Sequence, residues 1–551
     1  MNTLHTQVLV VGGGPVGLAL AVELGLRGVA VVLLERSDRH AQQPRAKTTN
    51  VRSMEHMRRW GIAERLRDAA PFGRGYGTDV VFATRLFGHE LACFDNAFYG
   101  QIPGRYDDRF AEGAQWIPQY KVEAALRARA AELPGVTLRL GTQLDGIAQD
   151  GDGVTAQAQD LTTGERLAIR ADYAIGADGA RSRVREAIGA RMEGTHAYAQ
   201  HLNAVIRAPG LRQAVRHRPA IMYWLVNPDS PAVASPMDDG DRWAFGCVLK
   251  PGEAVPDHAA LRARMNLAFG RDIEAEILVT DPWAAHSLIA DRYQDRRIIL
   301  AGDACHLHPP FGGYGMNLGL GDAVDLGWKL AARLQGWGGP ALVASYEAER
   351  RPVHNRVVAE AVANHALLPS DMARPMLEDA GPEGDAVRAE LGALILAGKE
   401  REFRTLGVVL GSGYPGSPIV VADGSAAPEE HPTRYTPSAH PGYRAPHLWL
   451  ADGSSLFDHF GWGFTLLQTR TGADVAPFMR AAAEAGVPLT VVVPADMRLA
   501  ALYEAPLVLI RPDQHVAWRG MEGADAAAIL DCARGAAAKP ARQPMPEGAS
   551  A

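Results

Sequence analysis

Cysteine is scarce in this sequence, with four residues in a chain of 551. Cys93, Cys247, Cys305 and Cys532 form no C-x-x-C pair, and their spacings suit neither a zinc site nor a disulfide framework. Histidine and aspartate show no cluster with the spacing of metal ligands. The sequence therefore predicts no metal, and it favours a reducing, cytoplasmic setting.

Long apolar runs and an excess of basic residues are also missing. No uninterrupted apolar stretch reaches the roughly 18 residues that a transmembrane helix needs. The opening MNTLHTQVLVVGGG has neither a basic region nor a cleavage site, so it lacks the features of a signal peptide. The formal net charge of −7 argues against a general nucleic-acid binder. We therefore expect neither a nucleic-acid partner nor a membrane partner.

The first 35 residues contain a legible nucleotide-binding pattern. Two short apolar runs, QVLVVG and AVVLLE, flank a helical stretch, which predicts a β-α-β unit and a parallel, doubly wound sheet. The glycines Gly12, Gly14 and Gly17 form G-x-G-x-x-G between the first strand and the helix. Glu35 ends the second strand, where it can accept hydrogen bonds from ribose hydroxyls. This context indicates a dinucleotide whose pyrophosphate lies at the helix N-terminus.

Two later segments carry further turn chemistry directly after an apolar strand. YAIGADGARSRVRE, from Tyr173 to Glu186, ends a strand in G-A-D-G. RIILAGDACHLHPPFGGYGMN, from Arg297 to Asn317, places Asp303 at the end of a buried strand. A carboxylate there is costly unless it is hydrogen-bonded, and a polar cofactor chain would satisfy it. Asp178 in G-A-D-G has an alternative reading as an ordinary turn residue.

Together, these three segments resemble the class A FAD-dependent aromatic hydroxylases, which are typified by para-hydroxybenzoate hydroxylase. The resemblance covers roughly residues 5–365. GYPGSP and VLIRPDQHVAWRG extend it to the C-terminal part of the phenol hydroxylase, 3-(3-hydroxyphenyl)propionate hydroxylase and polyketide hydroxylase branch. The implied fold is α/β, with a Rossmann-type FAD-binding domain interleaved with an antiparallel-sheet substrate domain, and a thioredoxin-like C-terminal domain.

The expected domains follow the chain in six parts. They are the first FAD-binding part (1–185), the substrate sheet (186–290), the returning FAD-binding part with its helices (291–405), a linker (406–442), the thioredoxin-like domain (443–535) and a disordered tail (536–551).

The resemblance also implies which residues hold FAD. Glycines hold the pyrophosphate, Glu35 the adenosine ribose and Asp303 the ribityl chain, and a helix expected to start at Asn317 stabilises the reduced flavin. The full predicted set is Gly12, Gly14, Pro15, Val16, Gly17, Glu35, Arg36, Arg45, Gln119, Asp178, Gly302, Asp303, Pro310, Gly313, Gly315, Met316 and Asn317.

The implied reaction is hydroxylation of a phenolic ring, ortho or para to an existing hydroxyl. NADH or NADPH reduces FAD, and the reduced flavin reacts with O2 to give a C4a-hydroperoxide that transfers oxygen to the ring. A small phenolic substrate in aromatic degradation is expected, with polyketide tailoring as the alternative. A flavin-dependent halogenase is disfavoured because QWIP lacks the first tryptophan of W-x-W-x-I-P. A non-catalytic flavin-binding regulator is disfavoured because all three motifs are intact. The family is often dimeric, so a homodimer is compatible.

A base that deprotonates the phenol would make the ring a better nucleophile. Candidates in or facing the substrate domain are His201, Tyr223, His286 and Tyr314, although each can instead be a packed or surface residue. The motif places His306 and His308 near the flavin, with structural hydrogen bonding as the alternative. AIMYWLVNP (220–228) predicts an aromatic pocket wall or, equally, plain sheet core.

Overall fold

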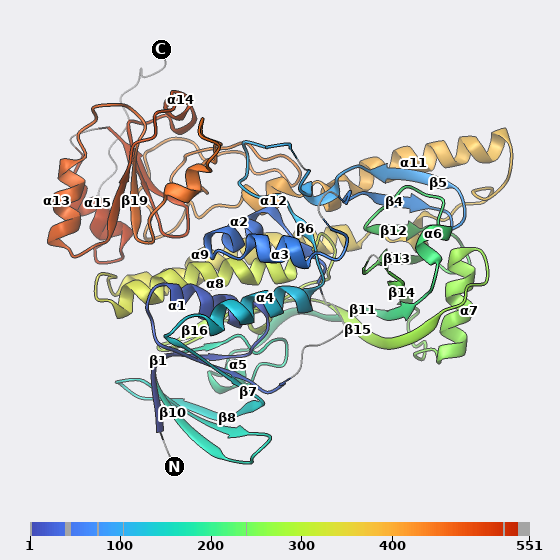
Figure 1. Cartoon of the computed structure of the whole chain (residues 1–551), viewed down its shortest axis with the longest axis horizontal. Coiled ribbons are helices and arrows are strands. Elements are labelled where there is room, and N and C mark those ends of the chain that lie inside the picture. The colour runs from blue at the N-terminus through green and yellow to red at the C-terminus, as the bar shows by residue number, and fades with distance from the viewer. Residues whose placement is uncertain are drawn as a thin grey trace.

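The computed structural model describes residues 3–38, 46–73, 76–102, 104–238, 240–521 and 524–537. Three sheets organise this part of the chain (Figure 1). The first sheet lies at the lower left of Figure 1, the second at the right, and the third, in orange and red, at the upper left. None of the described helices has both the length and the apolar character that a bilayer crossing needs.

The first sheet confirms the expected β-α-β start. Its path is β16-β17-β10-β1-β2-β7, and β1 pairs in parallel with both β2 and β10. The strands are β1 (Thr3–Val11), β2 (Val31–Glu35), β7 (Val136–Leu140), β8 (Thr142–Gln149), β9 (Val154–Asp160), β10 (Arg166–Gly176), β16 (Gln294–Asp295) and β17 (Ile298–Leu300). The apolar runs are buried because helices cover the sheet: α1 packs against both α4 and α8. These helices are α1 (Pro15–Leu26), α4 (Gln119–Ala131) and α8 (Gly315–Leu334).

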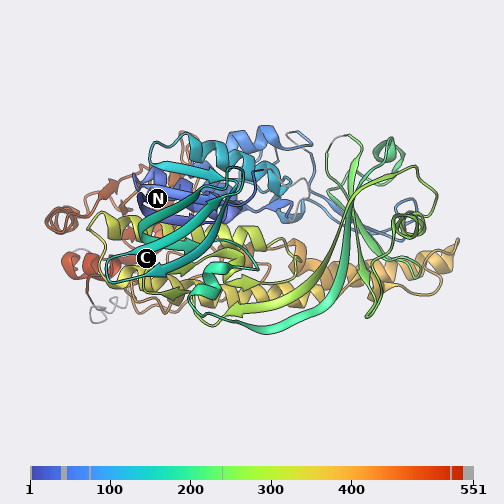
Figure 2. The ribbon, with the colours of Figure 1, turned by 90° about the horizontal axis from the view of Figure 1, so that it is seen from below.

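The second sheet has the order β18-β15-β11-β14-β13-β12-β4-β5. Its strands are β4 (Val80–Ala83), β5 (Glu90–Phe94), β11 (Met192–Arg207), β12 (Met222–Leu225), β13 (Ala232–Pro236), β14 (Arg242–Leu249), β15 (Glu276–Ala290) and β18 (His306–Leu307). The long strands β11 and β15 pair along the molecule (Figure 2). The sheet differs from an antiparallel sheet drawn only from 186–290: β4 and β5 come from earlier in the chain, β18 comes from later, and β4 pairs in parallel with β12. The fully apolar β4 is buried between β12 and β5 in this sheet.

Helices cover both faces of the second sheet. Helix α7 (His258–Phe269) packs on one face through Leu261, Met265 and Phe269. Helix α11 (Pro382–Phe403) packs on the other through Leu391, Ile395 and Phe403. Strand residues therefore point alternately toward α7 or toward the α11 side, which also faces the first sheet's helices.

The third sheet has the order β20-β19-β21-β22. Its elements are β19 (Phe464–Gln468), α13 (Ala476–Glu484), β20 (Leu489–Val492), α14 (Arg498–Tyr503), β21 (Leu507–Ile510), β22 (Val516–Gly520) and α15 (Ala526–Ala533). One parallel pair, β19 with β20, and two antiparallel pairs give the thioredoxin-like arrangement that was expected. Of the expected disordered tail, residues 538–551 lie outside the described residues.

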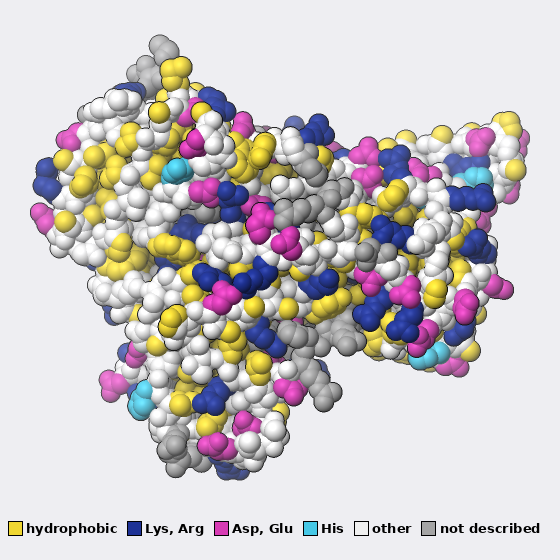
Figure 3. All heavy atoms as spheres, in the orientation of Figure 1, with side chains coloured by type: hydrophobic (Ala, Val, Ile, Leu, Met, Phe, Trp, Pro, Cys, Tyr) yellow, Lys and Arg dark blue, Asp and Glu magenta, His cyan; other side chains and the backbone are white. Residues whose placement is uncertain are grey.

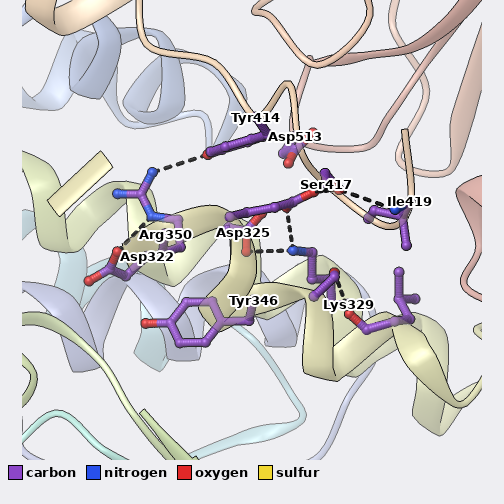
Figure 4. A network of polar contacts seen from close by, with 12 residues as sticks. Asp322, Asp325, Lys329, Tyr346, Arg350, Tyr414, Ser417, Ile419 and Asp513 are labelled. Carbon is purple, nitrogen blue, oxygen red and sulfur yellow. Dashed lines mark hydrogen bonds and ion pairs between the residues drawn. The ribbon is translucent and has the colours of Figure 1, made fainter. Parts of the chain in front are cut away.

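The segment expected as a linker (406–442) is packed against the body of the protein. After α12 (Leu406–Leu410) it runs without regular structure, yet Tyr414, Ile419 and Val420 are buried. The Ser417 hydroxyl donates to Glu349 on α9 (Ala341–His365). Figure 4 shows this segment lying over α8 and α9, beside a buried group of charges.

The remaining elements are short connectors. They are β3 (Thr48–Thr49), α2 (Val51–Arg59), α3 (Ala63–Ala69), β6 (Gln115–Trp116), α5 (Arg183–Ala187), α6 (Leu211–Ala214), α10 (Pro369–Met372) and the 3₁₀ turns Ala97–Tyr99, Gly302–Ala304 and Leu456–His459.

Candidate functional site

One cavity of about 770 Å³ runs from the first sheet to the second. At one end it is lined by the loop that follows β1, including Gly12 and Gly14, and at the other by the tryptophans Trp224 and Trp283. Its volume falls in the range typical of ligand and cofactor sites. We therefore take this cavity as the candidate functional site and build it from its two ends.

The glycine loop at the first end is shaped for close backbone approach. Gly12 has a φ of +110°, and a Cβ there would lie 2.2 Å from the carbonyl oxygen of Ala177. A Cβ on Gly17 would lie 1.9 Å from the carbonyl oxygen of Gly12, so this glycine lets α1 pack against the loop. A Cβ on Gly14 would meet no atom within 4 Å, because this residue faces the cavity. The loop and the start of α1 at Pro15 thus form the anion-binding cradle that a dinucleotide needs.

Glu35 ends β2 and organises the same loop. Its Oε2 accepts a hydrogen bond from the Gly13 backbone N–H at 2.6 Å, and its Oε1 accepts one from Ser37 at 2.8 Å. Glu35 and Arg36 both line the cavity. This position is compatible with the expectation that Glu35 meets the ribose of the cofactor.

Asp178 also lines the cavity, but its contacts show a structural task. Its carboxylate accepts hydrogen bonds from the Ser182 hydroxyl and from the backbone N–H groups of Arg183 and Val184, which caps α5. Burial raises the pKa of Asp178. The turn-and-cap alternative therefore accounts for much of this aspartate.

Asp303 lies in the turn after β17 and faces the cavity. Gly302 has a φ of +63°, and its N–H donates to Asp322 at 3.0 Å, which fixes the turn. Asp303 is exposed here and lines the cavity, although the strand before it is buried.

The loop after Pro309 leads into α8 along the cavity wall. Helix α8 begins at Gly315, two residues before the expected start. Asn317 lies inside the first turn, where its side chain accepts from the Asn50 N–H and donates to the carbonyls of Thr48 and Gly313. These bonds hold the loop and the N-terminus of α8 against the cavity.

Most of the predicted cofactor residues meet in this one cavity. The ones that line it are Gly12, Gly14, Pro15, Val16, Glu35, Arg36, Gln119, Asp178, Asp303, Pro310, Gly313, Gly315 and Met316. Gly17, Gly302 and Asn317 lie behind the wall and shape it. Arg45 lies outside the described residues.

His306 and His308 both line the cavity, and His306 belongs to a buried chain of hydrogen bonds. Its Nε2 lies 3.1 Å from Asp322, whose other oxygen contacts His354 Nε2 at 2.8 Å. Arg350 donates to the same aspartate at 2.8 Å. Burial alone would raise the pKa of Asp322, but His354 and Arg350 hold it well below its usual range. With a guanidinium already on this carboxylate, the cluster is a structural hydrogen-bonded network rather than an open set of metal ligands.

The second end of the cavity is a chamber lined by one face of the second sheet. Mostly alternate residues on neighbouring strands line it, namely His201 and Asn203 (β11), Met222 and Trp224 (β12), Val233 and Ser235 (β13), Gly246 and Val248 (β14) and Trp283 (β15), together with Ala232 and Cys247 between them. The aromatic wall predicted for 220–228 is therefore present in Met222 and Trp224, while the intervening residues form core. Such a chamber suits a flat apolar ring.

His201 is the candidate base that reaches this chamber. Its ring stacks on Trp283 at a centroid distance of 4.2 Å, and its Nε2 lies 3.1 Å from Nε2 of His365. Burial, with the neighbouring His365, lowers the pKa of His201 to about 4. His201 is thus neutral at neutral pH and able to accept a hydrogen bond, but it is a weaker base than an exposed histidine.

The other three candidate bases do not line the cavity. Tyr223 lies between two cavity residues on β12, so strand alternation turns it to the α7 face, where its hydroxyl bonds Arg218 and Ala220. His286 accepts a hydrogen bond from the Ala197 N–H. Tyr314 is the residue directly before α8. Its side chain packs in a buried cluster with Leu318, Val353 and Val357 rather than in the cavity.

Two family models match most of the chain. One, described as "FAD binding domain", matches residues 5–361. The other, described as "Aromatic-ring hydroxylase, C-terminal", matches residues 438–540. This chain belongs to the FAD-dependent aromatic-ring hydroxylases.

The relatives of this hydroxylase agree with that assignment. The tetracenomycin B2 monooxygenase-dioxygenase of Streptomyces olivaceus is 34% identical over 96% of this chain and 98% of its own. The 2,4-dichlorophenol 6-monooxygenase of Cupriavidus pinatubonensis is 32% identical over 96% of this chain and 95% of its own. The expected family and the expectation of an FAD-dependent aromatic monooxygenase are therefore confirmed.

Solved structures confirm the fold of this hydroxylase. The rebeccamycin biosynthetic enzyme RebC with reduced flavin has a TM-score of 0.89 at 36% identity, covering 98% of this chain and all of that one. Aklavinone-11 hydroxylase with FAD and aklavinone has a TM-score of 0.82 at 30% identity, covering 97% of this chain and all of that one.

The sequence did not predict several chamber residues of this hydroxylase. Asn203 could have been found from His201, because it lies two positions along the same strand and so on the same face. Trp283, on β15, could have been found once β15 was paired with β11, because it lies directly opposite His201. Phe311 lies within a recognised motif, but nothing local marked its ring as chamber wall. Glu402, at the end of α11, also lines the cavity and carries no local signal.

Proposed function

We propose that this hydroxylase transfers one oxygen atom of O2 to a phenolic ring, ortho or para to an existing hydroxyl, with FAD and with NADH or NADPH as the electron donor. The observation that carries the proposal is the single cavity joining the glycine cradle to the aromatic chamber. A cofactor held at one end can therefore present its reactive part to a ring held at the other.

The residues present fit FAD in this cavity. The open face of Gly14 and the start of α1 suit the pyrophosphate, Glu35 the ribose and Asp303 the ribityl hydroxyls. The N-terminus of α8, beginning at Gly315, suits the end of the flavin where negative charge gathers on reduction. When bound, FAD supplies the redox chemistry that activates O2.

The chain's own contribution is to orient the ring, exclude water and hydrogen-bond the phenolic hydroxyl. Trp224, Trp283 and Phe311 give the chamber apolar walls. His201 is positioned to accept a hydrogen bond from the phenolic hydroxyl, because burial lowers its pKa to about 4 and so keeps its ring neutral at neutral pH, although the same shift makes it a weak base. His365 fixes the ring of His201 through their Nε2 contact.

The relatives support two substrate classes. A small phenol in aromatic degradation follows from the similarity to the 2,4-dichlorophenol 6-monooxygenase. A polycyclic aromatic in polyketide tailoring is the second candidate, because the tetracenomycin B2 enzyme is matched over 96% of this chain and a similar solved structure holds aklavinone.

The proposal is tested with purified protein loaded with FAD. NADH and NADPH oxidation is measured with simple phenols, chlorophenols, hydroxyphenyl acids and polycyclic phenols, each beside its methyl ether. We expect phenol-stimulated consumption of one nucleotide and one ¹⁸O atom from ¹⁸O2 in the product. Protein that takes up no FAD, or a product whose oxygen comes from labelled water, would overturn the proposal.

A further inference from the structure

A buried ion pair forms part of the chamber wall at the end of α11. Glu402 lines the cavity, and its Oε2 accepts a hydrogen bond from Lys399 Nζ at 2.7 Å. The two side chains are only 4% and 1% exposed. Taking both charges out of water is costly, so a pair placed at a cavity wall calls for a reason beyond stability.

Lys399 is fully engaged away from the cavity. Its ammonium also donates to the carbonyl oxygen of Asn364 at 3.1 Å, and it lies 4.3 Å from the centroid of the Trp224 ring and 5.7 Å from that of Phe311. Lys399 does not line the cavity. Its part is therefore to fix and neutralise Glu402 rather than to meet a ligand.

Glu402 has acceptor capacity left over. Its Oε2 is taken by Lys399, while no residue in the described ranges donates a hydrogen bond to Oε1. A carboxylate has about four acceptor positions, and Glu402 lines the cavity, so its unshared oxygen is accessible from the cavity and can accept a hydrogen bond from a ligand there. Burial raises the pKa of Glu402, which makes it a stronger proton acceptor than an exposed glutamate.

The charge of the pair selects the kind of donor. Because Lys399 balances the carboxylate, the site as a whole is neutral, and a cationic ligand would bring an uncompensated charge into an apolar chamber. A neutral hydroxyl on an aromatic ring satisfies Oε1 without that cost, while the ring packs against Trp224 and Trp283.

We propose that Glu402, held by Lys399, is a specificity-determining residue that accepts a hydrogen bond from a neutral hydroxyl of the aromatic substrate. This inference rests on the proposed function for the nature of the substrate, and it adds a second polar contact to the one at His201. A charge-assisted hydrogen bond that is made with the hydroxyl and lost with its methyl ether corresponds to about a 10- to 100-fold difference in affinity.

The experiment measures binding rather than turnover. Titration calorimetry on the FAD-loaded protein compares 2-naphthol, 2-methoxynaphthalene and the cation 2-(aminomethyl)naphthalene. We expect 2-naphthol to bind at least about tenfold more tightly than either of the other two. In Glu402→Leu, and in Lys399→Met/Glu402→Leu, which leaves no unpaired buried charge, the acceptor is removed and the preference over the ether should fall below about threefold.

Asp385→Asn is the matched control, because Asp385 pairs with Arg388 at the same i,i+3 spacing on the same helix but lies away from the cavity. It should keep the full preference. Equal binding of naphthol and ether by the wild type, a preference that survives in both Glu402 variants, or tighter binding of the cation would each overturn the inference. Failure of hydroxylation in the turnover assay would leave these binding results unchanged, so the two proposals fail separately.

Discussion

The glycines of the first loop make different demands, and their substitution should separate folding from cofactor binding. Gly17→Ala places a methyl group 1.9 Å from the Gly12 carbonyl oxygen, so we expect a loss of about 1–3 kcal/mol of unfolding free energy. Gly14→Ala meets no protein atom and has an ordinary φ of −71°, so its stability should stay within about 0.5 kcal/mol of wild type. Its methyl group instead occupies the space for the pyrophosphate, and FAD affinity should fall at least about tenfold.

Urea unfolding without FAD and fluorimetric titration with FAD measure the two effects. Gly14→Ala is the control for the effect of adding a methyl group to this loop. Unchanged FAD affinity in Gly14→Ala would show that the cradle does not hold the cofactor as described.

His447 should make the protein sensitive to mild acid. It lies 3.0 Å from the Asp108 carbonyl oxygen through Nδ1 and 2.8 Å from the Ser455 hydroxyl through Nε2, and burial lowers its pKa to about 4. The unfolded chain, with a histidine pKa of 6.5, binds more protons between these values, so stability is lost as pH falls from about 6.5 toward 4. His447→Gln lacks this titration. Its stability deficit relative to wild type should therefore shrink by about 2 kcal/mol between pH 7.5 and pH 5. Urea unfolding at four pH values checks this, and a constant deficit would contradict it.

Strand alternation decides which aromatic side chains of β12 meet the substrate. Trp224 faces the chamber, and Tyr223, one residue before it, faces α7. Tyr223→Phe should cost about 1 kcal/mol of stability, through the lost bonds to Arg218 and Ala220, and leave 2-naphthol affinity within about twofold. Trp224→Leu should weaken 2-naphthol binding by about tenfold because it removes a wall of the chamber. Calorimetry and thermal melting separate the two variants; weaker binding by Tyr223→Phe would contradict this arrangement of β12.

The sequence predicted those features whose cause is local. The turn glycines around Gly12, the acid at Glu35 and the strand before Asp303 each depend on a few neighbouring residues, and these parts meet in the cavity. Because adjacent residues of a strand point to opposite faces, placing Trp224 in the chamber wall could also have excluded Tyr223 as a candidate base in the chamber.

Features that depend on distant partners could not be predicted. Glu402 reaches the chamber because α11 packs on the second sheet, and its partner Lys399 has meaning only there. β4 joins β12 from 142 positions away, counted from Val80 to its partner Met222, which no local pattern specifies. Tyr414 and Ser417, in a turn-rich stretch expected as a linker, are buried against α9, whose charged residues Arg350 and Glu349 bond their hydroxyls.

The C-terminal unit is built into the core of the FAD-binding part rather than attached to it. Trp328 and Leu342, from α8 and α9, share one hydrophobic cluster with Phe464, Leu509 and residues of α15. Arg511 donates to Glu349 at 2.6 Å and to Asp325 at 3.1 Å, while Lys329 bonds the same two carboxylates. Helix α8, which begins at the cavity, is thus held at its middle by Arg511, the residue that follows β21 of the third sheet. Figure 4 shows Asp325 and Lys329 of α8 close to Asp513 of the same C-terminal unit.

On the face shown in Figure 3, basic and acidic side chains are interspersed. The charges around Arg511 form a separate group, because the side chains of Arg511, Lys329 and Glu349 are fully buried. Arg511→Met should remove the arginine from a site that keeps Asp325 and Glu349 on Lys329, and Asp513 beside His515. A buried network that loses one partner is typically destabilised by about 3–5 kcal/mol, and we expect that loss of unfolding free energy together with weaker FAD retention.

The control is Arg498→Met, because Arg498 lies in the same unit but is half exposed beside Asp496. Its loss should cost no more than about 1 kcal/mol. Adding Glu349→Gln to Arg511→Met should recover part of the loss by removing one uncompensated carboxylate. Urea unfolding and the FAD content after gel filtration measure these effects. Equal losses in the Arg511 and Arg498 variants would show that the third sheet does not hold α8 through this network.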